Sequence, residues 1–559
     1  MPIQRHLTAP VLVQSSVSFS TMVAMTHSDV VRPMGVHLIW LQLLRLLLGI
    51  LGCLSLGLAS LSGIGTPPAL AVPLGTYGST SQPEILRLTP EVQVAVGYGV
   101  SNVSLITGPT GSILIDAADS VTSAQKLLPQ FRALSDRPLQ AIIYTHSHPD
   151  HTGGAQVWVQ QFNAAPDPAP AIYARSNFNQ TLDRAESLGA IAQQRRDWEH
   201  GFGLAARDRA VYFGESLPPP QNIGGGTLPP THTFAGDHLS LSIGGIALDL
   251  VAAPGESPDE LYVWLPQQNI VFCGDNYYSA FPNLSAIRGT PYRDVAQWVA
   301  SLDSMVAKAP EYLVPGHSAP LGNRDDIQRV LGNYSAAIDA VLTQTLEGMN
   351  QGLTPDQLVQ RVQLPPDLAQ LPYLQPVYGE IAPAVRSIFA AYLGWFDGNP
   401  THLNPLAPLV QAQHLAHLAG GITALWHQAH TAAAIEDYLW VLQLTDALHE
   451  LLGDQTLEIT PAPEPGSAEP PALTRSALAQ LRAMALDGLA DREINTNASN
   501  YYRSAAHALR SDPPLWHLGV SADVAAIEGP PTHNPPTHNP PTHNPKNKVL
   551  KQAFSGLGE

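Results

Sequence analysis

A short turn rich in histidine constrains the fold of this chain more than any other feature of its sequence. Its letters, HSHPDH, place His146, His148, Asp150 and His151 within six positions. The turn directly follows an apolar run that is typical of a buried strand, so we expect it in the loop beyond the carboxyl end of that strand. His146 and His148 lie two positions apart, so they point the same way and can share one metal ion. Asp150 and His151 face a second ion, and because neutral imidazoles and carboxylates suit zinc, the turn predicts a zinc site.

Three further residues of the metal-binding type follow predicted strands in the same way. Glu256, Asp275 and His317 each stand shortly after an apolar run, in the sequences Pro-Gly-Glu, Gly-Asp-Asn and Pro-Gly-His. A sandwich of sheets gathers such strand ends together, so we expect these side chains to join the histidine turn. The two cysteines, Cys53 and Cys273, are too few for a Cys-based zinc site or a disulfide scaffold.

Length and periodicity divide the chain into four parts. With 559 residues it is too long for one compact domain. We predict a leader over residues 1–71, a β-rich catalytic domain over 72–325, an α-helical domain over 326–511 and a disordered tail over 512–559, which repeats PPTHN three times. Strands are predicted at 111–116, 139–144, 247–252, 262–265, 270–273 and 312–314. Helices are predicted along one apolar face from Ile327 to Leu346, and at 378–396, 411–431, 434–452 and 474–510.

The leader has the features of a secretory signal peptide. An uncharged apolar stretch begins after Arg45, and Ala69-Leu70-Ala71 follows as a cleavage site. Cleavage there makes the protein periplasmic or secreted. Two alternatives stay open: the stretch is long enough to remain as a membrane anchor, and Cys53 stands in a loose lipid-attachment motif. We expect contact with a membrane only if the leader is retained.

The charge balance excludes one class of partner. The chain has 28 Lys and Arg against 46 Asp and Glu, a formal net charge of -18. Nucleic-acid binding needs a basic surface, so we expect no nucleic-acid partner. A local cluster of metal ions and arginines can still dominate the field inside a pocket, so an anionic substrate is compatible with this balance.

The histidine turn resembles the signature of the metallo-β-lactamase superfamily. The stretches 274–278, 281–284 and 287–294, with 392–400 in the helical part, are similar to the alkyl sulfatase branch. The resemblance implies an α+β fold, in which the αββα sandwich of that superfamily precedes an all-α dimerisation domain. It also implies a homodimer and a small-molecule substrate, because that branch hydrolyses sulfate esters of alkyl alcohols, such as dodecyl sulfate, with a metal-activated water.

The resemblance implies that seven residues hold two zinc ions per subunit. One ion would be held by His146, His148 and Glu256, the other by Asp150, His151 and His317, and Asp275 would bridge both. Asp150 and Asp275 would count among the catalytic residues. Some members of the branch carry glutamate at the bridging position, one methylene longer than Asp275. The branch often ends in a sterol-carrier-like domain, which we do not expect in the 49 residues after Arg510.

Five residues are predicted to contact the substrate. Arg288 and Arg293 lie five positions apart, just after the Gly-Asp-Asn motif. Their planar guanidinium groups match sulfate oxygens in bidentate fashion, so we expect them to grip the sulfate, with Asn283 assisting. Tyr392 and Gln221 are further candidates.

Three other functions use the same residues. The first is hydrolysis of another ester, thioester, lactone or phosphate ester, which the paired arginines disfavour. The second is a diiron redox protein, since histidines and carboxylates also hold iron, although the sequence has no phosphate-cradling glycine loop for a flavin partner. The third is a binding protein without catalysis, which the complete set of seven ligands disfavours.

Overall fold

The computed structural model describes residues 83–163, 168–180, 187–210, 223–453 and 470–516. The chain falls into two units, Met1–Pro68 and Ala69–Glu559, and all described residues belong to the second. The predicted leader, Gln221 and the PPTHN tail lie outside the described residues. Within the described part, no helix has the length and apolar character that crossing a membrane requires.

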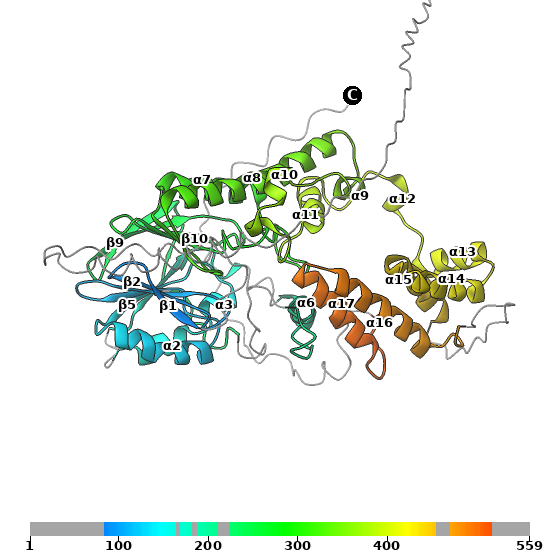
Figure 1. Ribbon diagram of the computed structural model, residues 1–559, viewed down its shortest axis with the longest axis horizontal. Helices are drawn as coiled ribbons and strands as arrows, with labels where there is room; N and C mark the ends of the chain where they lie inside the picture. Colours follow the sequence, from blue (N-terminus) through cyan, green and yellow to red (C-terminus); the bar gives the residue numbers. More distant parts are fainter. Residues whose placement is uncertain (1–82, 164–167, 181–186, 211–222, 454–469, 517–559) are drawn as a thin grey trace, which may run out of the picture. The chain divides into compact units, whose positions relative to one another are not determined.

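Two mixed β-sheets form the part of the chain that carries the histidine turn (Figure 1). The first sheet orders seven strands as they follow in sequence: β1 (Glu84–Arg87), β2 (Val92–Val96), β3 (Val103–Thr107), β4 (Ser112–Ile115), β5 (Leu139–Ile143), β6 (Ala171–Arg175) and β7 (His232–Phe234). Its first four strands are antiparallel, and β4 to β7 are parallel. The carboxyl ends of these parallel strands therefore lie at one edge, where β5 runs into the histidine turn.

The second sheet has six strands in a different spatial order. They are β13 (Leu321–Gly322), β12 (Tyr312–Pro315), β11 (Ile270–Gly274), β10 (Leu261–Leu265), β9 (Ile246–Ala252) and β8 (His238–Ile243). Only β11 and β12 are parallel, so their carboxyl ends lie side by side. All six predicted strands are confirmed, each with ends within one residue of the prediction.

The two sheets face each other across a shared hydrophobic core. In β9, the buried residues Ile246, Leu248 and Leu250 alternate with partly exposed ones, which is the period of a strand with one face turned inward. They pack with residues of the first sheet such as Ile113 and Ile143. On the outer face of the first sheet lie α2 (Val121–Leu134) and α4 (Ala155–Gln161), which follows the one-turn helix α3 (Pro149–Thr152).

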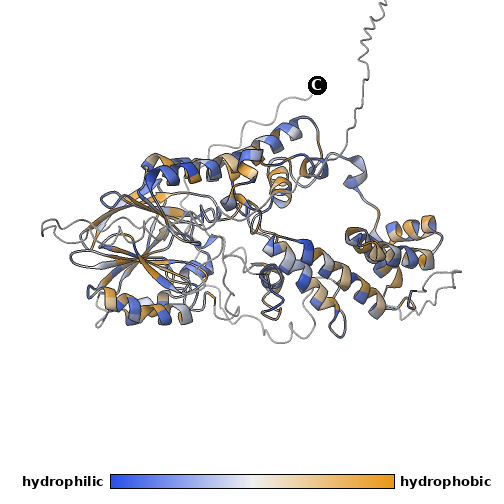
Figure 2. Cartoon of the chain, in the orientation of Figure 1, coloured by the Kyte–Doolittle hydropathy of each residue, from blue (hydrophilic) through white to orange (hydrophobic). Residues whose placement is uncertain are grey.

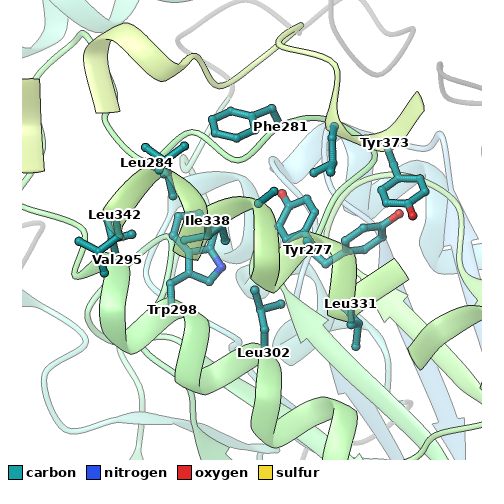
Figure 3. Close-up of a cluster of buried hydrophobic side chains, with 14 of the residues drawn as sticks. Tyr277, Phe281, Leu284, Val295, Trp298, Leu302, Leu331, Ile338, Leu342 and Tyr373 are labelled. Carbon is teal, nitrogen blue, oxygen red and sulfur yellow. The ribbon is translucent and has the colours of Figure 1, made fainter. Parts of the chain in front are cut away.

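The outer face of the second sheet is covered by α7 (Val295–Lys308) and α8 (Arg324–Asn350). Figure 3 shows Trp298 and Leu302 of α7 beside Leu331 and Ile338 of α8. Each fully buried large side chain contributes about 1.5–3 kcal/mol relative to exposure. The alternation of hydrophilic and hydrophobic residues along α8 is visible in Figure 2. Helices thus cover both sheets, and the predicted α+β fold with an αββα sandwich is confirmed.

Short and long helices fill the rest of the described chain. They are α6 (Ala190–His200), α9 (Pro355–Val359), α10 (Pro366–Ala369), the 3-10 helix η2 (Pro372–Leu374), α11 (Ile381–Leu393), α12 (Pro400–Leu403), α13 (Pro408–Ala419), α14 (Ile422–Ala434), α15 (Tyr438–Leu452), α16 (Arg475–Arg492) and α17 (Thr496–Leu509). Helices α13 to α16 share a hydrophobic core of their own around Trp426. The helical character predicted after residue 326 is confirmed, while the domain boundaries stay predictions.

Two predicted helices are wrong as single elements. The helix predicted over 411–431 is divided into α13 and α14 by Gly420 and Gly421, whose φ angles of 95° and 117° end the first helix in a left-handed turn. The helix predicted over 474–510 is divided into α16 and α17, because the Asn495 side chain accepts a hydrogen bond from the Ala498 amide and so begins a new helix.

Candidate metal centre

The structure brings all seven predicted ligands together at the loops that leave the strand ends. Three groups of ligand atoms each lie within 4.8 Å of one another: His146, His151 and Asp275; Asp150, His151 and His317; and His148, Glu256 and Asp275. The second group coincides with one predicted zinc site. Of the other predicted site, His148 and Glu256 share a group with Asp275, while His146 shares a group with His151 and Asp275 and lies 2.8 Å from His148. The assignment of single ligands to single ions therefore stays a prediction.

Asp275 lies at the centre of the cluster, as a bridging ligand must. Its Oδ2 lies 3.5 Å from His146 Nε2 and 3.3 Å from His317 Nε2. Its Oδ1 lies 3.3 Å from His151 Nε2. Asp150 joins from the side, with its Oδ2 3.5 Å from His151 Nε2 and 3.4 Å from His317 Nε2. One carboxylate thus touches three imidazoles that come from two different loops.

The local sequence explains how the loops approach so closely. Pro149 takes the first position of α3, where its missing N–H costs no hydrogen bond, and the short helix then presents Asp150 and His151. At the end of β12, Gly316 precedes His317. A Cβ atom at Gly316 would lie 2.3 Å from Asp275 Oδ1, so only glycine permits the contact between the ends of β11 and β12.

The outer ring nitrogens of two histidines are held by fixed acceptors. His151 Nδ1 lies 2.8 Å from Asp116 Oδ2, and His317 Nδ1 lies 2.9 Å from the carbonyl oxygen of Val100. Both acceptors require a proton on Nδ1, so in the neutral imidazole the Nε2 lone pair is directed at the cluster. This arrangement is typical of histidines that bind metal, because the outer partner fixes the tautomer and orientation of the ring.

A third histidine is oriented through a hydroxyl relay. The Thr145 hydroxyl donates to Asp116 Oδ2 over 3.0 Å and lies 3.1 Å from His146 Nδ1. Since its proton is already donated to the carboxylate, the hydroxyl accepts from His146 Nδ1, and His146 Nε2 is left as an acceptor that lies 2.8 Å from His148 Nδ1. Asp116 also accepts the Thr145 amide over 2.8 Å. One carboxylate therefore orients two of the histidines.

Two buried carboxylates were missed from the sequence. Asp116 follows β4 directly, so the strand-end rule that found Asp275 would have found it too; its φ of 59° is rare for a residue other than glycine. Glu260 stands directly before β10, so a rule that looks for ligands after a strand does not predict it. Its Oε1 accepts the Asp275 amide over 2.6 Å and holds the central ligand in place.

Burial and the charges of neighbouring groups shift the pKa values of the cluster in opposite directions. Burial, followed by the charges of His151 and His148, lowers the pKa of His146 well below its usual value. Burial alone would raise the pKa of Asp275, but the neighbouring histidines outweigh it and hold that pKa well below the usual range. His151 shows the reverse balance, because carboxylates led by Asp275 outweigh burial and raise its pKa. Ionised oxygens thus face the centre of the cluster.

The donor set fits a divalent metal. Among the described residues, His151 Nε2, Glu256 Oε2 and Asp275 Oδ1 are buried and make no hydrogen bond. Buried polar atoms of folded proteins nearly always have partners, and cations held by the groups to which these atoms belong would satisfy them. Imidazole and carboxylate donors in this number suit zinc and neighbouring transition metals.

Arg293 and Asn283 place unpaired donors next to the ligands. Arg293 Nη1 lies 3.0 Å from Glu256 Oε1 and also donates to the Asn283 carbonyl. Its Nε and Nη2 atoms, and Asn283 Nδ2, are buried and without a hydrogen-bond partner in the described part of the chain. Three donors that lack acceptors beside a cationic centre suit an anion. Since Glu256 gives Oε1 to the arginine, its Oε2 remains for a metal.

Arg288 approaches the same place from another direction. Its Nη1 forms an ion pair of 2.8 Å with Glu199 Oε2, a residue that the sequence analysis did not single out. The pKa of His148 is lowered to about 3, chiefly by burial, and the nearby charges of Arg288 and Arg293 contribute. Tyr392 is 49% exposed, and no hydrogen bond described for it leads to the ligands. Its role, like that of the undescribed Gln221, stays a prediction.

Two family models match the chain. The metallo-beta-lactamase superfamily matches residues 96–317, and the alkyl sulfatase dimerisation family matches residues 354–512. The first match contains all seven candidate ligands. The second contains α9 to α17.

Curated relatives and a solved structure agree with these matches. A linear primary-alkylsulfatase of Pseudomonas sp. is 35% identical over 345 residues, which cover 61% of this chain and 65% of that protein. The alkyl/aryl-sulfatase BDS1 of Saccharomyces cerevisiae is 27% identical and covers 65% of this chain and 57% of its own. The chain thus spans less than two thirds of the length of either relative. The structure of the inverting sec-alkylsulfatase Pisa1 from Pseudomonas sp. has the same fold, with a TM-score of 0.65 and 23% identity over 77% of this chain and 66% of its own.

Proposed function

We propose that this chain, which belongs to the metallo-β-lactamase superfamily and carries an alkyl sulfatase dimerisation domain, hydrolyses sulfate esters of alkyl alcohols. The observation that carries the proposal is the contact between the two halves of the site. Arg293 touches the candidate ligand Glu256 and keeps two buried donor atoms unpaired. The Glu256 carboxylate therefore links the candidate metal cluster to Arg293, the group that can bind an anion. The similarity to alkylsulfatases supports sulfate as the anion.

We assign the metal centre to two zinc ions per subunit. The seven candidate ligands supply four imidazoles and three carboxylates, which is enough for two ions that share Asp275. Ions held there would lower the pKa of a water molecule toward neutrality and so supply the nucleophile. Asp116 and Glu260 hold His151 and the Asp275 backbone in position for that task.

The protein's own groups bind and orient the ester. A sulfate monoester carries one negative charge spread over three oxygens, and Arg293 Nε and Nη2 with Asn283 Nδ2 offer three donors to them. Such donors stabilise the charge that grows on the sulfate as the ester bond to the alcohol breaks. Water contributes its hydroxyl and a proton, so the products are the free alcohol and sulfate. Methylene groups of the alkyl chain gain about 0.8 kcal/mol each when buried, so chain length should affect KM.

The helical part supports a homodimer. Large apolar side chains are exposed there, among them Trp395 at 74%, Leu418 at 83% and Ile435 at 73%. Trp395 follows α11, Leu418 lies in α13 and Ile435 follows α14, and large exposed apolar side chains of this kind are candidates for an association surface. The match to a dimerisation family supports a second copy of the chain as the partner that covers them.

The decisive experiment measures products from a defined ester. Metal-loaded protein should release sulfate from dodecyl sulfate, with para-nitrophenyl sulfate and a lactone as comparison substrates. Arg288→Ala should abolish most of this activity, whereas Arg324→Gln, which removes a surface ion pair with Glu311, should leave it unchanged. Lactone hydrolysis without sulfate release would move the assignment to another hydrolase of the same fold, and full activity of Arg288→Ala would remove that arginine from the substrate site. Fractionation of cells that express the full chain tests the proposed export by residues 1–71.

A further inference from the structure

Each arginine beside the metal cluster is paired with one buried carboxylate. Arg293 is paired with Glu256, and Arg288 is paired with Glu199. Glu256 has a second task as a candidate ligand, but Glu199 belongs to none of the metal-binding groups found among the described residues. The side chain of Glu199 has no solvent exposure, and its contact with Arg288 spans 89 positions of sequence. The role of Glu199 therefore needs a separate explanation.

The position of Glu199 is unfavourable for a carboxylate without a partner. It lies in the last turn of α6, where the helix dipole repels negative charge, and burial removes it from water. Burial alone would raise its pKa, but the guanidinium of Arg288 outweighs burial and holds that pKa below the usual value. The group is thus an ionised carboxylate at neutral pH, and Arg288 is the charge that keeps it so.

The C-terminal helix α17 fixes α6 in this position. The Ser504 hydroxyl donates to the Trp198 carbonyl over 3.3 Å, and the Trp198 ring meets Tyr501 edge to face with 5.4 Å between centroids. Asn500 of α17 also binds Ala210, which lies in the segment that follows α6. The Asn500 side chain accepts a hydrogen bond from the Ala210 amide over 2.8 Å and donates one to the Ala210 carbonyl over 2.9 Å. Glu199 is therefore held by a frame outside the metal cluster and does not simply follow the movements of Arg288.

The pairing has a consequence for anion charge. A sulfate ester is a monoanion, whereas the sulfate released from it is a dianion at neutral pH. Glu199 cancels one unit of positive charge while leaving the remaining N–H groups of Arg288 as oriented donors. Cancelling that charge weakens binding of a dianion about twice as much as binding of a monoanion, because the Coulomb energy is proportional to charge. The carboxylate thereby favours the ester over its product.

We propose that Glu199 is a positioning and specificity residue, which orients Arg288 and tunes the anion site for a monoanionic ester over a dianionic product. The inference rests on the proposed function and extends it to the charge of the substrate. Phosphate monoesters are dianions at neutral pH, so the charge of Glu199 disfavours their binding as well. Release of sulfate after hydrolysis is favoured for the same reason.

The test compares two small anions of similar shape that differ by one charge. Methanesulfonate carries one negative charge and inorganic sulfate carries two. Their affinities for the metal-loaded protein are measured by calorimetry, and as inhibition constants for octanol release from octyl sulfate. Glu199→Gln keeps an acceptor for Arg288 but removes the charge, so sulfate should gain about tenfold in affinity relative to methanesulfonate.

Two further variants separate charge from position. Glu199→Asp keeps the charge but is too short for the 2.8 Å contact, so KM for octyl sulfate should rise while the ratio of the two anion affinities stays that of the wild type. Glu311→Gln removes a carboxylate from a surface pair with Arg324 and should change neither quantity.

The outcomes decide the inference independently of turnover. An unchanged affinity ratio in folded Glu199→Gln, or the same shift in Glu199→Asp, overturns it. If Glu199→Gln does not fold, the wild type still decides, because a preference for sulfate over methanesulfonate of about tenfold or more contradicts the proposal. Absence of octanol release from the wild type refutes the proposed function instead, and the calorimetric comparison then remains as the test of Glu199.

Discussion

The carboxylate of Asp116 should control metal affinity without touching the metal. It accepts three hydrogen bonds, of which Oδ2 receives two: the Thr145 hydroxyl at 3.0 Å and His151 Nδ1 at 2.8 Å. In Asp116→Asn, one side-chain oxygen remains for the Thr145 amide at 2.8 Å, and an NH₂ group replaces the other. That group donates, so His151 Nδ1 must become an acceptor and its proton moves to Nε2. The proton then occupies the direction in which a metal binds.

The size of the effect follows from this change of tautomer. Loss of an outer partner of a metal-binding histidine typically lowers metal affinity by about 10–100-fold, which is about 1.4–2.7 kcal/mol. Because Thr145 orients His146 through the same oxygen, the substitution disturbs two ligands, and we expect the upper part of this range. Stability of the metal-free protein should change less, since the loss of a buried charge partly offsets the lost hydrogen bonds.

Competition with a chromophoric chelator measures the zinc affinity directly, and urea unfolding of the metal-free protein checks that the variant is folded. Asp303→Asn is the matched control, because the Asp303 carboxylate accepts the Ser335 hydroxyl over 2.9 Å between α7 and α8, away from the ligands. A zinc affinity of Asp116→Asn within about twofold of the wild type would refute the reasoning.

Four further predictions concern metal, pH, the C-terminal helix and association. Chelation should lower the thermal midpoint, since metal at about 100 times its Kd contributes about 2.7 kcal/mol; an unchanged midpoint contradicts the metal centre. Burial lowers the pKa of His200 to about 4 in the folded protein. As the pH falls below about 6.5, this histidine therefore binds a proton in the unfolded chain but not in the folded one, and the free energy of unfolding declines by about 2 kcal/mol toward pH 5. His200→Gln should lessen that decline in urea titrations, and an equal decline refutes the assignment. Asn500→Ala leaves the amide and carbonyl of Ala210 without partners and should lower the free energy of unfolding by about 1–3 kcal/mol. It should also raise KM for octyl sulfate more than it lowers kcat, and a larger effect on kcat than on KM would contradict this prediction. Trp395→Asp should shift the proposed homodimer toward monomer in sedimentation, and an association state equal to that of the wild type excludes Trp395 from the interface.

Local patterns predicted the ligands because ligands at strand ends are a local property. An apolar run followed by Gly-Asp or Pro-Gly-His marks both the strand and the loop that leaves it, so the positions of Asp275 and His317 could be read without knowledge of their neighbours. Asp116, which directly follows the apolar strand β4, has the same local pattern. The division of α13 from α14 was equally visible in the Gly420-Gly421 pair.

Pairings between distant segments could not be predicted in this way. Nothing near Glu199 in sequence indicates that its partner is Arg288, and a glutamate in an otherwise polar helix reads as a surface residue. Arg293 was expected to meet only substrate, yet it also binds Glu256, because two loops from different strands converge. Such contacts depend on how elements pack, which hydrophobic periodicity does not encode.

Helix α17 contacts α6, which carries Glu199, and also a second segment around Tyr378 that leads toward Asn283. Beyond its grip on α6, Asn495 and Asn497 each donate to the Tyr378 carbonyl over 3.0 Å, and the neighbouring Gly379 amide donates to the Phe281 carbonyl over 3.0 Å, two residues before Asn283. During synthesis on the ribosome, every candidate ligand emerges long before this helix does. A nascent or truncated chain that stops ahead of Thr496 lacks the contacts of α17 with α6, and with them the brace that we infer for Glu199.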